Sequence, residues 1–250
     1  MTLKFESCTV ACFGRALVQE GGEYRPTTET ARRAHEVGHF WQSPYQPTIR
    51  SIVCAGGYPK SMLHMEKPPN GISEASFQHS ILQKQWKVPD SLICIEGDSH
   101  NTFLQFSNCI QQGFLQVGAY TAQHPLVFSM STPNSWRIGL LAQAILQIPA
   151  GGMYRLKPGN DPFENATATQ ERERDLTVMT KLAIDIVDAN KTSSPTSNVL
   201  RYIEDIYAAF TKVRKQFEGG EYGEKKVAYA NFMRIHRYPW PIIEVPILNY

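Results

Sequence analysis

Short apolar runs alternate with longer amphipathic stretches over residues 8–156 of the chain. Within each run the apolar residues are consecutive rather than alternating, which is typical of strands buried on both faces. The runs are CTVACF, SIVCA, SLICIE, PLVFSMS and GGMYRL. Between them, apolar residues recur at helical spacing, and helices are predicted over residues 27–42, 73–87, 102–115 and 135–146. Helices that connect successive strands impose crossovers, so the pattern predicts an α/β fold with a mainly parallel sheet covered on both faces.

The last third of the chain has a different pattern. Residues 171–190 and 197–217 carry apolar positions at helical spacing, and the breaker SSPTS separates them. A mixed tail follows, ending in the Pro-rich sequence WPIIEVPILNY. We therefore predict an α/β domain over residues 1–158. A C-terminal helical appendage with its tail, residues 159–250, is expected to pack on that domain.

The composition and net charge of the chain limit the classes of binding partner that we expect. The 250 residues include 42% apolar and 19% charged residues, and the formal net charge is +2, which does not favour nucleic acid as a partner. We expect no membrane span and a cytoplasmic location, because there is no signal pattern and no window of about 18 uninterrupted apolar residues. The five cysteines form no C-x-x-C pair and mostly lie in or beside strand-like runs, so buried reduced thiols are expected.

In a parallel sheet, ligands bind beyond the carboxyl ends of the strands. That rule selects the loops that open at Gly14, Gly56, Glu96 and Ser131. Gly56 and Gly57 follow their strand directly, and glycine lets backbone amides approach an anion. A simple tight turn explains the two glycines equally well.

Three further segments near these strand ends carry polar groups. The loop Glu96-Gly-Asp-Ser-His-Asn-Thr102 offers hydroxyls, an amide and a carboxylate that can read a sugar, phosphate or amino-acid group. Any one of these residues alone is explained as a helix cap in a solvated loop. Glu74, in Ser-Glu-Ala at a helix start, is favourable beside the helix dipole. Arg137 suits two parallel hydrogen bonds to a carboxylate or phosphate, or an ordinary surface salt bridge.

In their order and spacing these loops resemble the SanA/ElyC/YdcF family. The family pattern has a strand ending in glycine, a strand ending in two glycines, a Ser/Thr-Glu-Ala helix start and a Val-Pro step before the sequence Glu-x-x-Ser-x-Asn-Thr. That last motif stands here as Glu96, Ser99, Asn101 and Thr102. The family's fourth loop usually has a histidine three residues before an arginine, whereas this chain has Asn134 and Arg137. Chemistry that needs an imidazole at that position is therefore unsupported.

The resemblance implies a Rossmann-like three-layer fold and a nucleotide-like small-molecule ligand. S-adenosylmethionine is the first candidate, because one member of the family is described as binding it. Glu74 and Glu96 are the candidate catalytic acid or base, and no metal is predicted. The residues suit a binding protein and an enzyme alike, and a homodimer is one option for assembly. The predicted ligand-binding residues are Gly14, Gly56, Gly57, Ser99, Asn101, Thr102, Asn134 and Arg137.

A competing motif lies in the first predicted helix, which contains the sequence HEVGH from His35 to His39. This is the H-E-x-x-H signature of zinc peptidases, in which two histidines on one helix face hold zinc and the glutamate acts as general base. Glu66 or Glu74 is a candidate third ligand. A helix after the first strand of a parallel sheet is a poor match to that class, and two histidines on a partly exposed helix face are the simpler interpretation. A zinc-dependent hydrolase is the first alternative function, and a non-catalytic interaction protein is the second.

Overall fold

The computed structural model describes residues 5–58, 68–69, 71–130, 132–149, 151–157, 167–190, 193–219 and 242–244. It divides into two compact units. The first unit comprises Met1–Met130, Pro149–Asn160 and Pro241–Tyr250. The second comprises Ser131–Ile148 and Asp161–Trp240. The chain passes from one unit to the other more than once, so each unit is built from segments distant in sequence.

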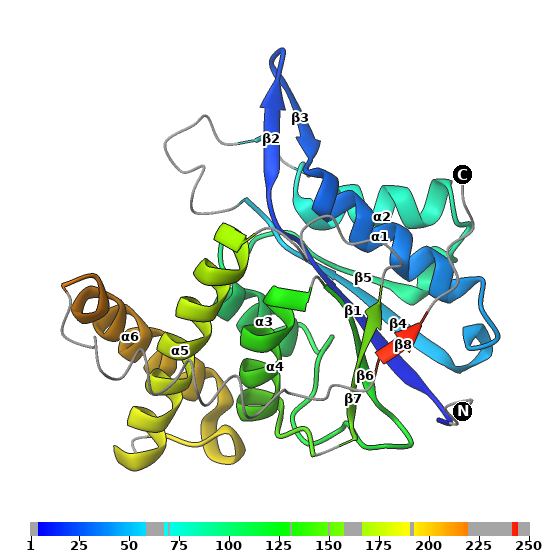
Figure 1. Cartoon of the computed structure of the whole chain (residues 1–250). Coiled ribbons are helices and arrows are strands. Elements are labelled where there is room, and N and C mark those ends of the chain that lie inside the picture. Colours follow the sequence, from blue (N-terminus) through cyan, green and yellow to red (C-terminus); the bar gives the residue numbers. More distant parts are fainter. Residues whose placement is uncertain are drawn as a thin grey trace. The chain divides into compact units, whose positions relative to one another are not determined.

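A parallel sheet forms the centre of the first unit (Figure 1). In the described part of the chain its strand order is β5-β4-β1-β6-β7-β8, and every neighbouring pair is parallel. The strands are β1 (Cys8–Phe13), β4 (Ile49–Ala55), β5 (Ile93–Glu96), β6 (Leu126–Ser129), β7 (Met153–Lys157) and β8 (Ile242–Glu244). This is the doubly wound order of Rossmann folds, with the direction of winding changing between β1 and β6. The predicted Rossmann-like α/β fold is confirmed.

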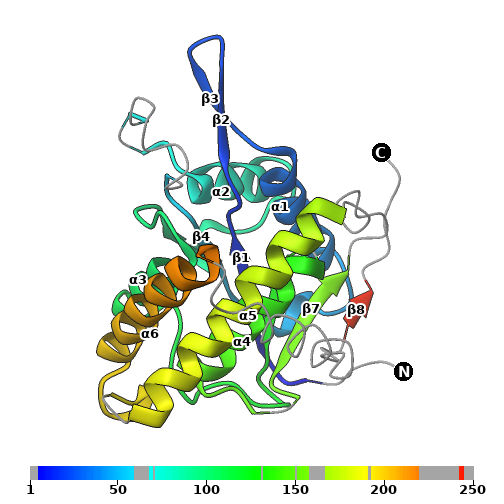
Figure 2. The same ribbon diagram turned by 60° about the vertical axis from the view of Figure 1, so that its left-hand side comes forward.

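Helices cover both faces of this sheet (Figure 2). On one face, α1 (Thr28–Trp41) and α2 (Glu74–Lys84) pack together in a core with the side chains of Val10 and Cys12. On the other face, α3 (Thr102–Gln111) contributes Phe106, whose ring meets Phe13 edge-on with centroids 5.2 Å apart. Successive residues of a strand point to opposite faces, so β1 feeds two cores and its apolar run is continuous.

Each of these helices begins at a capping side chain, as their sequences suggest. Thr27 accepts a hydrogen bond from the backbone of Thr30 at the start of α1. Ser73 and Ser76 form a reciprocal capping box at α2, and Asn101 caps α3. Such caps satisfy amide groups that the first helical turn leaves unpaired. Two short 3-10 helices, η1 (Gln46–Thr48) and η3 (Asp90–Leu92), precede β4 and β5.

A hairpin that the sequence pattern did not predict lies between β1 and α1. It pairs β2 (Leu17–Glu20) with β3 (Glu23–Pro26) in an antiparallel register and extends away from the sheet (Figure 1). The turn consists of Gly21 and Gly22, which both have positive φ angles of 60° and 83°. Glycine adopts this conformation without strain, and it suits a two-residue hairpin turn.

The second unit is helical in its described residues. It contains α4 (Thr132–Leu146), α5 (Thr167–Asn190) and α6 (Pro195–Glu218), which pack against one another. The predicted helices over residues 171–190 and 197–217 correspond to α5 and α6. The apolar stripe of α6 is buried, and consists of Tyr202, Ile203, Ile206, Phe210 and Val213. Within the part of the chain that the structure describes, no helix is long and apolar enough to cross a membrane.

Candidate functional site

Three neighbouring strands end together at one edge of the sheet. Gly14 donates its backbone N–H to the Ala55 carbonyl at 2.6 Å, and Gly56 donates to the Glu96 carbonyl at 2.9 Å. The hydrogen bonding between β1, β4 and β5 therefore continues into the loops that follow these strands. The structure thus brings together three of the residues that the sequence selected, Gly14, Gly56 and Glu96.

The Glu74 side chain lies over two of these glycines. A Cβ atom on Gly14 would come within 2.1 Å of the Glu74 carboxylate, and one on Gly56 within 2.2 Å. Gly56 also has a φ of +143°, which disfavours other residues. The glycines are therefore explained by the approach of Glu74. Their neighbour Gly57 is explained similarly, since its Cβ would lie 2.4 Å from the backbone oxygen of Gly97.

The start of α2 is anchored on the same loop. The backbone N–H groups of Glu74 and Ala75 donate to the carbonyls of Gly57 and Gly56, at 3.2 and 2.8 Å. These two amides would otherwise be open donors at a helix N-terminus. The loop already satisfies these two backbone amides. The remaining polar group of this turn is the Glu74 carboxyl.

The Glu74 carboxyl is buried and incompletely bonded. Its side chain is almost fully inaccessible, and in the described part of the chain Oε1 has no hydrogen-bond partner. Burial raises the pKa of Glu74 to about 8, against the opposing charges of Arg33 and Arg15 and with a contribution from Glu96 and Glu29. At neutral pH the carboxyl is therefore mostly protonated, so it can both donate and accept a hydrogen bond.

Glu96 is also fully buried, but its oxygens are occupied. Oε1 accepts from the backbone N–H groups of Asp98 and Ser99 and from the side-chain amide of Asn108, each at 2.9 Å. The Ser99 hydroxyl donates to Oε2 at 2.6 Å. These four bonds fold the loop after β5 back on its own strand. The family-like motif thus places Glu96 and Ser99 in a structural contact with each other.

The other two residues of that motif lie at the start of α3. The Asn101 side-chain oxygen accepts from the Leu104 backbone at 3.0 Å, which caps the helix. Its Nδ2 atom is buried and has no hydrogen-bond partner among the described residues. Thr102 is the first residue of the helix. Asn101 thus has a buried polar atom without a partner in the described region, as Glu74 does.

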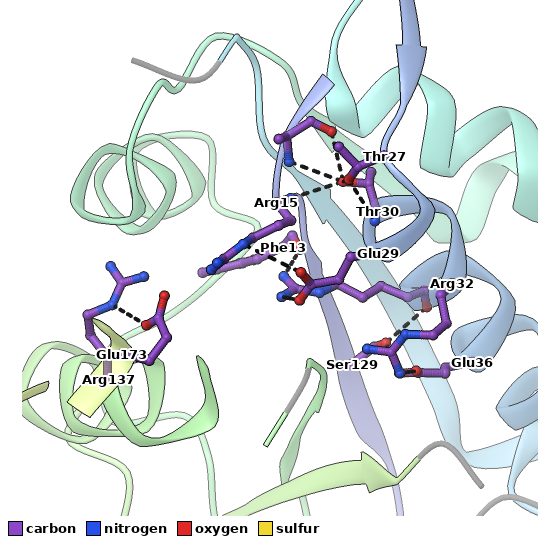
Figure 3. Close-up of polar contacts among 12 residues, drawn as sticks. Phe13, Arg15, Thr27, Glu29, Thr30, Arg32, Glu36, Ser129, Arg137 and Glu173 are labelled. Carbon is purple, nitrogen blue, oxygen red and sulfur yellow. Dashed lines mark hydrogen bonds and ion pairs between the residues drawn. The ribbon is translucent and has the colours of Figure 1, made fainter. Parts of the chain in front are cut away.

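A buried group of charged residues beside the end of β1 was missed by the sequence reasoning (Figure 3). Arg33 donates to the Phe13 carbonyl at 2.6 Å and to the Glu29 carboxylate at 2.5 Å, and its side chain is only 1% exposed. Arg15 approaches the same carboxylate at 3.4 Å. Thr30 accepts from the backbone N–H groups of Arg15 and Ala16, which fixes the loop after β1. The i, i+4 spacing of Glu29 and Arg33 was the available signal, but such pairs usually lie on exposed helix faces.

The HEVGH segment lies in α1, where its histidines face Trp86. The Trp86 indole N–H donates to His35 Nδ1 at 3.1 Å, and the ring of His39 packs against Trp86 with centroids 4.5 Å apart. Burial lowers the pKa of both histidines. Glu36 instead pairs with Arg32 and accepts from the Ser129 hydroxyl at 2.6 Å (Figure 3).

This arrangement favours a packing role for the segment. The glutamate that would serve as general base is already engaged by a cation and a hydroxyl. In the searched, described portion of the chain, no group of three or more His, Cys, Asp or Glu side chains could hold a metal ion. The candidate third ligand Glu66 lies outside the described residues, whereas Glu74 lies over the glycines at the strand ends.

Two of the predicted ligand-binding residues belong to the second unit. Arg137, in α4, forms an ion pair with the buried Glu173 of α5, with Nε 3.3 Å from the carboxylate (Figure 3). Asn134 lies in α4, and its side chain is outside the described residues. The structure therefore gives Arg137 a partner within its own unit.

No protein-family model, curated protein or solved structure matches this chain.

Proposed function

We propose that the chain binds a small, nucleotide-like molecule beyond the carboxyl ends of β1, β4 and β5, and that Glu74 recognises it. The observation that carries the proposal is the buried Glu74 Oε1 atom, which has no partner among the described residues. A buried polar atom left unpaired costs about 1–3 kcal/mol, so a ligand that completes its hydrogen bonding is favoured there.

The position of this atom agrees with the general rule for doubly wound sheets. Ligands of such folds lie outside the carboxyl ends of the strands, near the point where the winding changes direction. That point is between β1 and β6 in the observed strand order, so Gly14, which follows β1, borders it, whereas Gly56 follows β4 on the other side of β1. The rule concerns position alone, so the class of ligand has to be inferred from the side chains.

A protonated glutamate presents one donor and one acceptor side by side, as a glutamine does. This pattern complements an adenine base, whose N6 amino group and ring nitrogens offer a donor beside an acceptor. S-adenosylmethionine is the first candidate within this class because of the resemblance to the SanA/ElyC/YdcF family. The same proposal includes a glutamate that acts as acid or base in a reaction. Glu74 is favoured over Glu96 for this role, because its oxygens make fewer hydrogen bonds.

A cytoplasmic location is also proposed, since buried free thiols such as those of this chain persist in reducing compartments.

The proposal is tested by native mass spectrometry and calorimetry of the purified protein with S-adenosylmethionine and with AMP. We expect binding that Glu74→Ala weakens about tenfold or more, as expected for one buried polar contact of about 1–3 kcal/mol. Glu74→Gln should stay within about threefold of the parent, because glutamine keeps the donor and acceptor. Glu204→Gln, on the exposed face of α6, is the matched control and should bind normally.

Either of two results would overturn this assignment. Equal affinity in Glu74→Ala and the parent would remove Glu74 from the site. A mass increment of one zinc ion that disappears in His35→Ala, without nucleotide binding, would make the hydrolase alternative the leading one. The same spectra report whether the chain is a monomer or a homodimer.

A further inference from the structure

A cavity lies at the amino-terminal end of the sheet in the first unit, opposite the strand ends that hold Glu74. Its volume is about 210 Å³. A molecule of liquid water occupies about 30 Å³, so the cavity has room for about seven waters or for a phosphate or carboxylate group on a short stem. The lining residues come from the starts of β1 and β4 and from the loop after α3, which approaches the sheet from a distant part of the sequence.

Hydroxyl groups line the β1 and β4 side of the cavity. Thr9 and Ser51 are partners in the parallel register, and their hydroxyls lie 3.3 Å apart. Ser7 lies two residues before Thr9, and its hydroxyl is 2.7 Å from His124 Nδ1. Glu6 approaches the other ring nitrogen of His124 at 3.7 Å, so the imidazole is held between the two side chains. Serine and threonine hydroxyls in such positions can donate to an anionic oxygen.

Two further donors complete the lining. Arg50 lies in β4 and is exposed, and no acidic partner contacts its guanidinium among the described residues. Tyr120 accepts a backbone hydrogen bond from Gln116 at 3.4 Å. Burial raises the pKa of Tyr120 to about 12, so its hydroxyl keeps a proton to donate. No carboxylate is among the described residues that line the cavity.

We propose that this cavity binds the oxyanion group, phosphate or carboxylate, of a small metabolite, with Arg50 as its main anchor. Arginine pairs with either group through two parallel hydrogen bonds. The hydroxyls of Thr9, Ser51 and Tyr120 supply neutral donors around it. The described lining residues supply donors and a cation but no carboxylate, which is the complement of an anion. This site is separate from the strand ends that hold Glu74 and does not depend on the function proposed there.

The test is thermal unfolding of the intact protein during titration with inorganic phosphate, and separately with acetate, at constant ionic strength. We expect a saturable rise in Tm in the parent, because a ligand that binds only the folded state stabilises it. Arg50→Gln should weaken the apparent affinity tenfold or more, and Ser51→Ala should weaken it by a smaller factor. Arg25→Gln, which removes the same charge from the exposed β2–β3 hairpin, is the matched control and should respond as the parent does.

The two titrations also separate the sources of the oxyanion. A response to phosphate alone assigns the site to a phosphorylated metabolite, whereas a response to acetate alone assigns it to a carboxylate. Equal responses in Arg50→Gln, Arg25→Gln and the parent would show a general salt effect and would overturn the proposal, as would no saturable response to either anion. Because Arg50 is exposed, its variant is expected to fold, which its Tm without added anion verifies.

Discussion

At the scale of single residues, the described structure separates polar groups that hold the fold from those available to a ligand. Glu96 and Glu29 are buried, and their carboxylates are engaged by hydrogen bonds or arginine. Glu74 is buried to the same extent, yet one of its oxygens is unpaired in the described region. Three glutamates in similar surroundings thus differ in how fully their oxygens are hydrogen-bonded, and the difference comes from the number of donors around each.

The raised pKa of Glu74 predicts how stability depends on pH. The pKa of Glu74 in the folded state is about 8, well above the ordinary glutamate value of 4.5, so between these pH values the folded state binds the proton more tightly than the unfolded chain. The contribution of Glu74 is therefore fully present below about pH 4.5 and is lost as the pH rises towards 8. Compared with Glu74→Gln, the parent should lose up to about 1.4 kcal/mol of unfolding free energy per pH unit in this window. Urea unfolding of both proteins at pH 5, 6, 7 and 8 measures this difference. The unfolding free energy falls linearly with urea concentration, so its value in water is obtained by extrapolation at each pH. Parallel pH profiles would show that Glu74 titrates normally in the folded protein.

At the scale of secondary-structure elements, the HEVGH sequence is explained by how α1 meets the segment after α2. Its two histidines contact the Trp86 ring, and Gly38 lies between them in sequence. A Cβ atom at Gly38 would come within 2.2–2.4 Å of three Trp86 ring carbons. The glycine therefore permits the close approach of the indole, and the spacing that resembles a zinc motif here surrounds a tryptophan.

Gly38→Ala tests this packing between α1 and the Trp86 segment. Alanine in a helix interior normally gains about 1 kcal/mol over glycine. Here we expect a net loss of stability, because overpacking a filled core costs about 1–3 kcal/mol or more and a bulky ring cannot move aside easily. Urea unfolding would measure the loss, and Trp86 fluorescence would report the displaced ring. Gly219→Ala, where the nearest contacts are an ordinary 3.4 Å, should change stability by no more than about 0.5 kcal/mol. A stabilised Gly38→Ala variant would show that α1 has room at this position.

At the scale of the whole molecule, most strands of the sheet core could be predicted because they contain several consecutive apolar residues, as in β1 and β6. The β2–β3 hairpin was missed because its strands, LVQE and EYRP, are mostly polar and partly exposed. Strand β8 has three residues and pairs with β7 from far along the chain, so no local pattern identifies it. The candidate site was located by the strand-end rule. The buried Arg33–Glu29 pair could not be predicted, because a charged pair in a helix gives the same sequence signal whether it is buried or exposed.

The cysteines offer a test of how the sheet unit unfolds as a whole. Cys8, Cys12, Cys54 and Cys109 are buried free thiols, and Cys94 is partly exposed. Burial raises the pKa of all five, to about 11 for Cys8, so very little thiolate is present at neutral pH. In a native sample treated with a thiol-specific chromophore at pH 7.5, we expect the partly exposed Cys94 to react slowly and the four buried thiols not to react. All five should react in urea, with a midpoint that matches unfolding followed by fluorescence. Because the four buried thiols lie in three elements of the sheet unit, β1, β4 and α3, their simultaneous exposure would show that this unit unfolds cooperatively. Reaction of one buried thiol well below the common midpoint would identify the element that opens first.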